Sequence, residues 1–252
     1  MLSFVARTHT GLVREGNEDA FIADAGLALF AVADGLGGHQ GGEVASRIAV
    51  DAITEFVTRS RLDTTITWPY GFEPGISVEG NQLRNAVLVA NQLIRSQAEA
   101  EPAHAGMGST VTAIAVADGR ASFVSIGDSR LYRWRKDALE QLSEDDTWIA
   151  AMARAGAAPA SVRHHQMRHM LTKALGPTPG LEAHAHDISV QNGDLLLLCS
   201  DGLYGPLDDD GIARVLAARV GDLDAAASAL IDAANAAGGP DNITAVLVRY
   251  DG

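Results

Sequence analysis

Hydrophobic and polar residues follow two different periods along this chain. Short apolar runs rich in β-branched or aromatic residues, most of them bounded by Gly or Asp, predict strands at 20–25, 27–33, 109–117, 121–127, 129–134, 194–200 and 242–250. Stretches with apolar residues at three- and four-residue steps predict helices at 42–60, 80–100 and 222–237. Asp118-Gly119 lies between two of the strands and predicts a two-residue hairpin.

The order of these elements predicts the fold class. A block of strands is followed by two successive helices, a second block of strands, and then a helix and a final strand. Because a regular β-α-β alternation is missing, we expect mostly antiparallel sheets and an α+β layered sandwich. The stretch 61–79 is expected to be a loop, and 145–170 a helical insertion between strands; both are candidates for surface flaps.

The composition then limits the class of protein. The chain has 252 residues, 47% hydrophobic and 20% charged, which is ordinary for a folded soluble protein. Its net charge of −13 argues against binding to nucleic acid or to anionic lipid. Cys199 is the single cysteine, so no intramolecular disulfide can form, which fits a reducing compartment. With no signal peptide and no apolar run of roughly 18 residues, we expect a cytoplasmic protein.

Acidic residues stand at the ends of the predicted strands. Six of them share this position: Glu18, Asp19, Asp34, Asp128, Asp201 and Asp241. A single Asp at a strand end is usually a turn or cap residue. Several that a sheet brings together repel one another unless a cation neutralises them. A carboxylate cluster without Cys or His spacing suits Mg²⁺ or Mn²⁺ rather than zinc.

A glycine-rich loop at 35–42 follows Asp34. It is not a P-loop, because Glu43 stands where that motif needs Lys, and it is not a G-x-G-x-x-G turn, because residue 40 is Gln. Close approach of the backbone to a metal ion explains the loop better. Asp34 would then be a ligand, and Gly35 would offer its carbonyl oxygen.

Seven short motifs occur in order along nearly the whole chain. They are REGNED (14–19), VADGLGGHQGGEVAS (32–46), MGST (107–110), SIGDSRLYRW (125–134), LTKALG (171–176), LLCSDGLYG (197–205) and GGPDNITAVLV (238–248). Together they resemble the motifs of the metal-dependent protein phosphatases, the type 2C Ser/Thr phosphatases, in their compact bacterial form. The resemblance implies one catalytic domain over 1–252 with a flap insertion at about 145–170. It also implies two antiparallel sheets flanked by helices, a four-layer αββα sandwich.

The resemblance implies hydrolysis of phosphoserine and phosphothreonine in proteins by in-line attack of a water that a binuclear Mn²⁺ or Mg²⁺ centre activates. Asp34 would bridge the two ions, and the Gly35 carbonyl would bind one of them. Asp201 and Asp241 would complete the binuclear site. Asp128, together with Asp201, would serve a third and weaker metal.

The resemblance also assigns the groups around the metals. Glu18 and Asp19 would hold metal-bound waters, and Arg14 would hold the substrate phosphate with its planar guanidinium. Leu36 follows Asp34-Gly35, near where members from higher organisms often carry His, so a metal-bound water is one candidate for protonating the leaving group. The implied partners are phosphorylated proteins, namely a Ser/Thr kinase and its substrates, and we expect a monomer.

Two other classes of hydrolase have a partial motif here. Gly127-Asp128-Ser129 looks like the start of a GDS-type serine esterase motif, although Leu131 stands where a nucleophile elbow needs Gly. A cysteine phosphatase does not fit, because Gly205 and not Arg stands six residues after Cys199. The serine hydrolase is therefore the main rival enzyme.

Two further alternatives are a zinc site and a binding domain without catalytic activity. His165 and His169 have the spacing of two ligands on one helix, but Gln166 stands where a metalloprotease needs its glutamate base. A phosphatase-like domain could instead sense phosphoprotein or metal without turnover. Loss of Arg14 or of a metal carboxylate would signal such a module, and the sequence retains all of them.

Overall fold

The strands and helices follow the predicted order, with several additions. This computed structural model describes residues 1–37, 41–63, 65–157, 165–167 and 169–252. Within these ranges the strands are β1 (Leu2–His9), β2 (Asp19–Asp24), β3 (Leu29–Leu36), β4 (Gly108–Ser109), β5 (Val111–Ala117), β6 (Arg120–Ile126), β7 (Arg130–Arg135), β8 (Ala138–Gln141), β9 (Ala185–Ser189), β10 (Leu195–Cys199) and β11 (Ile243–Tyr250). The helices are α1 (Gly41–Leu62), α2 (Val78–Ala100), α3 (Trp148–Arg154), α5 (Asp201–Tyr204), α6 (Asp209–Arg219) and α7 (Leu223–Ala236), with a 3-10 turn η1 (Pro102–His104). In this described part of the chain, no helix has both the length and the apolar character needed to cross a membrane.

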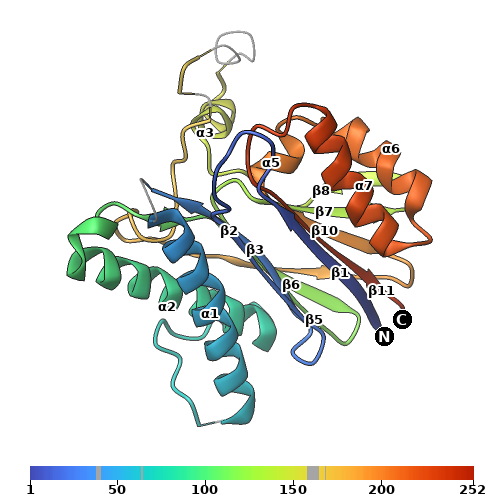
Figure 1. Cartoon of the computed structure of the whole chain (residues 1–252). Coiled ribbons are helices and arrows are strands. Elements are labelled where there is room, and N and C mark those ends of the chain that lie inside the picture. The colour runs from blue at the N-terminus through green and yellow to red at the C-terminus, as the bar shows by residue number, and fades with distance from the viewer. Residues whose placement is uncertain (38–40, 64, 158–164, 168) are drawn as a thin grey trace.

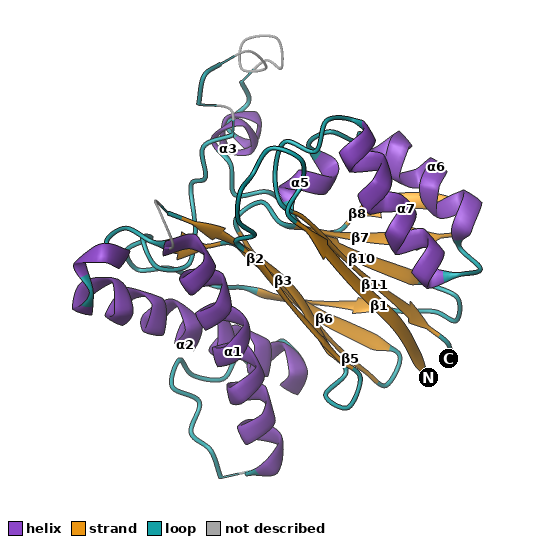
Figure 2. Ribbon diagram, viewed as in Figure 1, coloured by secondary structure: helices purple, strands orange, loops and turns teal. Residues whose placement is uncertain are grey.

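The strands form two antiparallel sheets (Figure 2). One sheet has the strand order β1-β11-β10-β7-β8, and the other has the order β2-β3-β5-β6-β9, with β4 paired to the end of β3. Figure 1 shows α1 and α2 on the outer face of the second sheet, and α6 and α7 on the outer face of the first. The predicted α+β, four-layer αββα sandwich is therefore confirmed.

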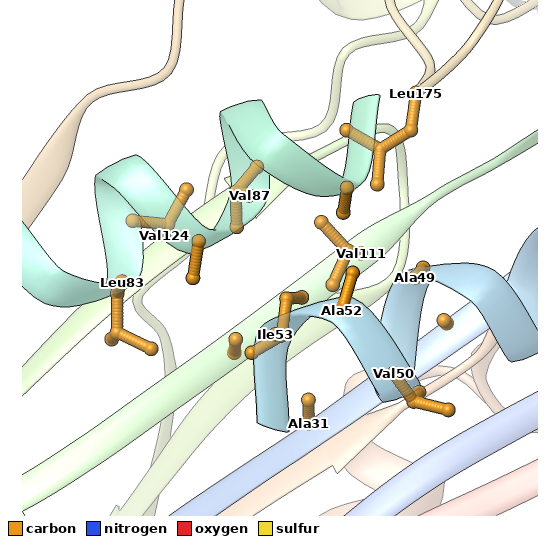
Figure 3. Packing of buried hydrophobic residues seen from close by; sticks show 14 of the residues in the cluster. Ala31, Ala49, Val50, Ala52, Ile53, Leu83, Val87, Val111, Val124 and Leu175 are labelled. Carbon is orange, nitrogen blue, oxygen red and sulfur yellow. The ribbon is translucent and has the colours of Figure 1, made fainter. Parts of the chain in front are cut away.

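Three apolar layers hold the sandwich together. One lies between α1, α2 and their sheet, and Figure 3 shows Ile53 and Leu83 of the helices lying over Val111 and Val124 of the strands. A second layer packs α6 and α7 on the other sheet around side chains such as Leu230. The third fills the space between the two sheets. Each large aliphatic side chain buried in this way contributes about 1.5–3 kcal/mol.

The predicted hairpin is confirmed, but the apolar pattern did not predict three of the strands. Asp118 and Gly119 have φ angles of 48° and 74°, as a tight turn between β5 and β6 requires. The strands that were not predicted are β1, β8 and β9. All three are edge strands, with one neighbour instead of two, and many of their side chains are exposed. Their polar faces therefore hide the strand signal.

The stretch 145–170 is only partly the helical insertion that we expected. Its helix is short, α3, and the other described residues form turns and irregular backbone, while 158–164 and 168 lie outside the described residues. The two ends of the stretch are joined, because the Trp148 amide donates to the Met170 carbonyl at 2.8 Å. The Thr172 amide likewise donates to the Asp146 carbonyl at 2.7 Å. In Figure 1, α3 lies outside the four layers.

Candidate active site

The ends of strands from both sheets meet at one edge of the sandwich. Asp19, the first residue of β2, lies opposite Asp34 of β3 in the strand register. The hydroxyls of Ser200, which directly follows β10, and of Thr244 in β11 donate to Asp19 Oδ2 at 2.7 and 2.6 Å. Residues up to 225 positions apart in the sequence therefore converge on one carboxylate.

Five carboxylates that the sequence singled out are brought together at this edge. Burial raises the pKa of Asp34 well above its ordinary value, and the negative charges of Asp19, Asp201, Asp128 and Asp241 raise it further. Burial is also the largest cause for Asp19 and Asp128, whose pKa values rise to about 7, and for Asp201, whose pKa rises to about 6. One carboxylate raises the pKa of another in this way only at short range, so the five carboxylates form one cluster.

Two oxygens of this cluster indicate that it fits a cation. Asp19 Oδ1 and Asp201 Oδ1 are buried, and neither accepts a hydrogen bond. A buried polar atom without a partner is costly, and a bound cation removes that cost. The donors are all oxygens, which suits Mg²⁺ or Mn²⁺. Within the described ranges, however, no three Asp, Glu, His or Cys side chains are already arranged to hold a metal ion.

Arg14 lies next to the cluster because Asp241 binds it. Its Nη2 donates to Asp241 Oδ2 at 2.7 Å, and about half of the Arg14 side chain is exposed. This hydrogen bond is the largest cause that raises the pKa of Arg14. The backbone amide of Asn242 donates to the other oxygen of Asp241 at 2.9 Å. A cation that binds Asp241 must therefore displace Arg14 or share the carboxylate with it.

The glycine-rich loop allows the backbone at Gly35 to contact the backbone at Gly42 and at Glu18. A Cβ on Gly35 would lie 2.1 Å from the carbonyl oxygen of Gly42 and 2.7 Å from that of Glu18, so no other residue fits there. The Gly35 amide donates to the Glu18 carbonyl at 3.1 Å. A Cβ on Gly42 would lie 2.7 Å from the carboxyl carbon of Glu18. The loop thus brings the Glu18 carboxylate against the start of α1, and burial raises the pKa of Glu18.

Asn242 is a residue of the site that the sequence pattern did not single out. Its Nδ2 donates to the carbonyls of Thr10 and Gly16, both at 2.9 Å, and its Oδ1 accepts the Glu18 amide at 2.8 Å. These three bonds fix the loop that carries Arg14 and Glu18. A buried Asn between Asp241 and a strand was the available signal, because such an amide must find partners.

Ser200 and Thr244 were missed for a different reason. Both belong to runs whose pattern predicts strands, and that pattern does not distinguish them from other strand residues. Both are fully buried, and their hydroxyls point to Asp19. A buried hydroxyl inside an apolar run was the signal that could have identified them.

Asp128 lies on the turn after β6, and the serine that follows it is inaccessible. Tyr204 donates its hydroxyl to the Asp128 carbonyl at 2.8 Å. Ser129 is 1% exposed, and its hydroxyl is hydrogen-bonded to Thr110 Oγ1 at 2.7 Å. A nucleophile must reach its substrate, so this geometry argues against the serine hydrolase.

The cysteine and histidine alternatives find no support either. Cys199 is fully buried in β10, and burial raises the pKa of its thiol. The ring of His165 stacks on Trp148 with 4.3 Å between the ring centres. A stacked imidazole in an irregular segment is not half of a helical zinc motif.

The chain is similar to a set of known phosphatases. A family model described as protein phosphatase 2C matches residues 8–234. The serine/threonine protein phosphatase PstP of Mycobacterium tuberculosis is 38% identical over an alignment of 261 residues, gaps included. The alignment covers 100% of this chain and 46% of PstP. The chain thus spans about half the length of that relative. The serine/threonine phosphatase stp of Listeria monocytogenes is 32% identical over 97% of this chain and 94% of its own length.

Solved structures agree with this similarity. The crystal structure of the M. tuberculosis phosphatase PstP/Ppp has a TM-score of 0.85 and 36% identity, and covers 100% of this chain and 99% of its own. The structure of the PstP catalytic domain in complex with two manganese ions has a TM-score of 0.82 and 36% identity, over 100% of this chain and 99% of its own.

Proposed function

The chain belongs to the protein phosphatase 2C family, and from this we propose that it is a protein serine/threonine phosphatase that hydrolyses phosphoserine and phosphothreonine. The observation that carries the proposal is the cluster of five strand-end carboxylates, with two buried oxygens that lack a partner. Such a cluster repels a phosphate dianion unless cations neutralise it. Bound divalent cations would therefore allow this site to accept a phosphate dianion.

We assign two Mn²⁺ or Mg²⁺ ions to Asp34, the Gly35 carbonyl, Asp201 and Asp241, and a third, weaker ion to Asp128 with Asp201. When bound, the ions would polarise the phosphoryl group and ready a water for in-line attack. The relative with two bound manganese ions supports the pair, since it shares the fold and 36% of the sequence. The unpartnered Asp201 Oδ1 supports a cation beside that residue.

The remaining roles belong to side chains that face the cluster. Glu18 and Asp19 would orient water, and Asp19 has one buried oxygen left to accept a hydrogen bond. Arg14 would bind the phosphate, because its half-exposed guanidinium lies beside the carboxylates. In the reaction the water oxygen would form a bond to phosphorus and give up a proton, the bond from phosphorus to the Ser or Thr oxygen would break, and that oxygen would leave with a proton supplied by water in the site.

We also propose a domain organisation and a class of partner for this chain. We assign the activity to one catalytic domain over 1–252, with 145–170 as a flap insertion. The substrates would be cytoplasmic phosphoproteins, with a Ser/Thr kinase and its targets as partners, and the enzyme would act as a monomer. A single buried thiol, Cys199, is compatible with a reducing compartment.

The test is a phosphatase assay with and without divalent metal. We expect Mn²⁺-dependent hydrolysis of p-nitrophenyl phosphate and of phosphoserine and phosphothreonine peptides, abolished by a chelator, and little turnover of a phosphotyrosine peptide. Activity that survives chelation and is blocked by a fluorophosphonate would point to the serine hydrolase instead. Phosphopeptide binding without turnover would point to the binding module.

A further inference from the structure

Arg130 is a nearly buried cation that none of the proposed roles uses. It lies two residues after Asp128, at the start of β7. Its Nε and Nη2 donate to the two carboxylate oxygens of Asp145 at 3.0 and 2.7 Å, and its Nη1 donates to the Tyr132 hydroxyl at 2.8 Å. The exposed fractions of the Arg130 and Asp145 side chains are 19% and 15%. A planar guanidinium is needed to make these bonds together.

The guanidinium also fixes an aromatic ring. Its central carbon lies 3.6 Å from the ring centre of Tyr204, a cation–π contact. Tyr204 belongs to α5, which begins at Asp201, and its hydroxyl donates to the Asp128 carbonyl at 2.8 Å. Arg130 therefore sets the position of a ring whose hydroxyl holds the backbone of Asp128.

The peptide on the other side of Asp128 is held from the start of the 145–170 stretch. The Asp146 amide donates to the Gly127 carbonyl at 2.7 Å, and Asp146 Oδ2 accepts the Gly127 amide at 3.2 Å. Asp145, the neighbour of Asp146, is the residue that Arg130 binds. Asp128 is thus fixed from both sides, and both attachments lead back to the same short segment.

We propose that Arg130 and Tyr204 are positioning residues that hold Asp128 in place for the cation it shares with Asp201, and that join this position to the start of the 145–170 stretch. This inference rests on the proposed metal-dependent function. The weakest class of metal site should therefore depend on the Tyr204 hydroxyl and the Arg130 guanidinium, although neither group would touch metal or substrate. A side chain that merely stabilises the fold would not affect one class of site selectively.

The chain offers matched controls for both groups. Tyr204→Phe removes the hydroxyl that holds Asp128, whereas Tyr70→Phe removes the hydroxyl of an exposed residue in the loop between α1 and α2. Arg133, on the same strand as Arg130, pairs with Glu140 of β8 at 2.5 Å. Arg133→Lys therefore controls for Arg130→Lys.

The experiment measures Mn²⁺ binding to the full chain by the electron paramagnetic resonance signal of free Mn²⁺, with melting temperatures in parallel. We expect Tyr204→Phe and Arg130→Lys to weaken the weakest class of sites at least 5-fold and to leave the tighter class unchanged. Tyr70→Phe and Arg133→Lys should bind as wild type does. The Mn²⁺ concentration needed for half-maximal phosphopeptide turnover should shift in the same variants, with little change in KM.

Three results would overturn the inference. They are wild-type binding in Tyr204→Phe, an equal loss in all four variants, and a single class of Mn²⁺ site in the wild-type protein. Turnover by the wild-type chain is measured separately. A chain that binds Mn²⁺ in two classes but does not cleave phosphopeptide contradicts the proposed function, and the binding curves alone still decide whether Tyr204 and Arg130 position Asp128.

Discussion

At the scale of single residues, the carboxylates of the site are held by different devices. Two hydroxyls fix one oxygen of Asp19 and leave the other buried without a donor. Asp241 is instead held by Arg14 and by a backbone amide. The first arrangement leaves an oxygen available to a cation or a water. The second makes a cation compete with an arginine.

Asp34→Asn tests the cluster with almost no change in shape. We expect Mn²⁺ affinity and phosphopeptide turnover to fall by at least about 100-fold, because the residue that we propose as a ligand of both ions would lose its charge. Binding is measured by calorimetry and turnover by phosphate release. Asp118→Asn, in the hairpin between β5 and β6, is the control, and normal activity in Asp34→Asn contradicts the assignment.

Arg14→Ala separates phosphate binding from metal binding. We expect KM for a phosphopeptide to rise about 10- to 100-fold, since a charge-assisted contact to phosphate is lost. Mn²⁺ binding should not weaken, because the guanidinium that occupies Asp241 Oδ2 is gone. Arg7→Ala, which removes an exposed pair with Asp224, is the control. An unchanged KM would remove Arg14 from the phosphate role.

At the scale of elements, strand ends were predictable where they carry charge. Asp34, Asp128 and Asp201 each follow an apolar run, so their convergence could be expected from the sequence alone. Asn242 and Thr244 could not be recognised in the same way, because their importance lies in contacts with Glu18 and Asp19 from distant segments. An edge strand such as β9 does not show the apolar pattern, because most of its side chains are exposed.

The glycine-rich loop has a structural reason that the sequence pattern did not predict. We predicted close approach to a metal, and the structure shows close approach of backbone to backbone. Gly35→Ala should lower the free energy of unfolding by about 3 kcal/mol, because its Cβ meets the Gly42 carbonyl and neither can move freely. Urea unfolding measures the change. Gly16→Ala, with no atom within 4 Å of the added Cβ, should cost far less; equal losses in the two variants would refute the packing argument.

At the scale of the whole molecule, an acidic protein with a net charge of −13 buries a cluster of carboxylates at one edge of its fold. Folding raises the pKa of Asp201 to about 6 and those of Asp19 and Asp128 to about 7, against roughly 3.9 in an unfolded chain. A group whose pKa is higher in the folded state stabilises the fold at low pH, and this stabilisation is lost as pH rises through the folded pKa. Metal-free protein should therefore lose stability as pH rises from about 4 to 8.

Thermal unfolding in a chelator, followed across that range, tests this expectation. The melting temperature should fall by several degrees towards pH 8, and saturating Mn²⁺ should restore most of it, since bound cations stabilise the ionised carboxylates. Asp19→Asn should flatten the profile in the chelator. A melting temperature that climbs from pH 5 to pH 8 without metal would mean that the cluster is not under electrostatic strain.

The pairing of β1 with β11 has a consequence for biosynthesis. The second residue of the chain lies opposite residue 250, and β11 is an inner strand of its sheet. Asp241 and Asn242 immediately precede that strand, so a segment more than 220 residues after the N-terminal loop supplies both a candidate ligand and the clamp for that loop. Contacts this distant in sequence form late and slowly. A nascent chain should accordingly lack a complete carboxylate cluster until β11 has been translated and paired with β1.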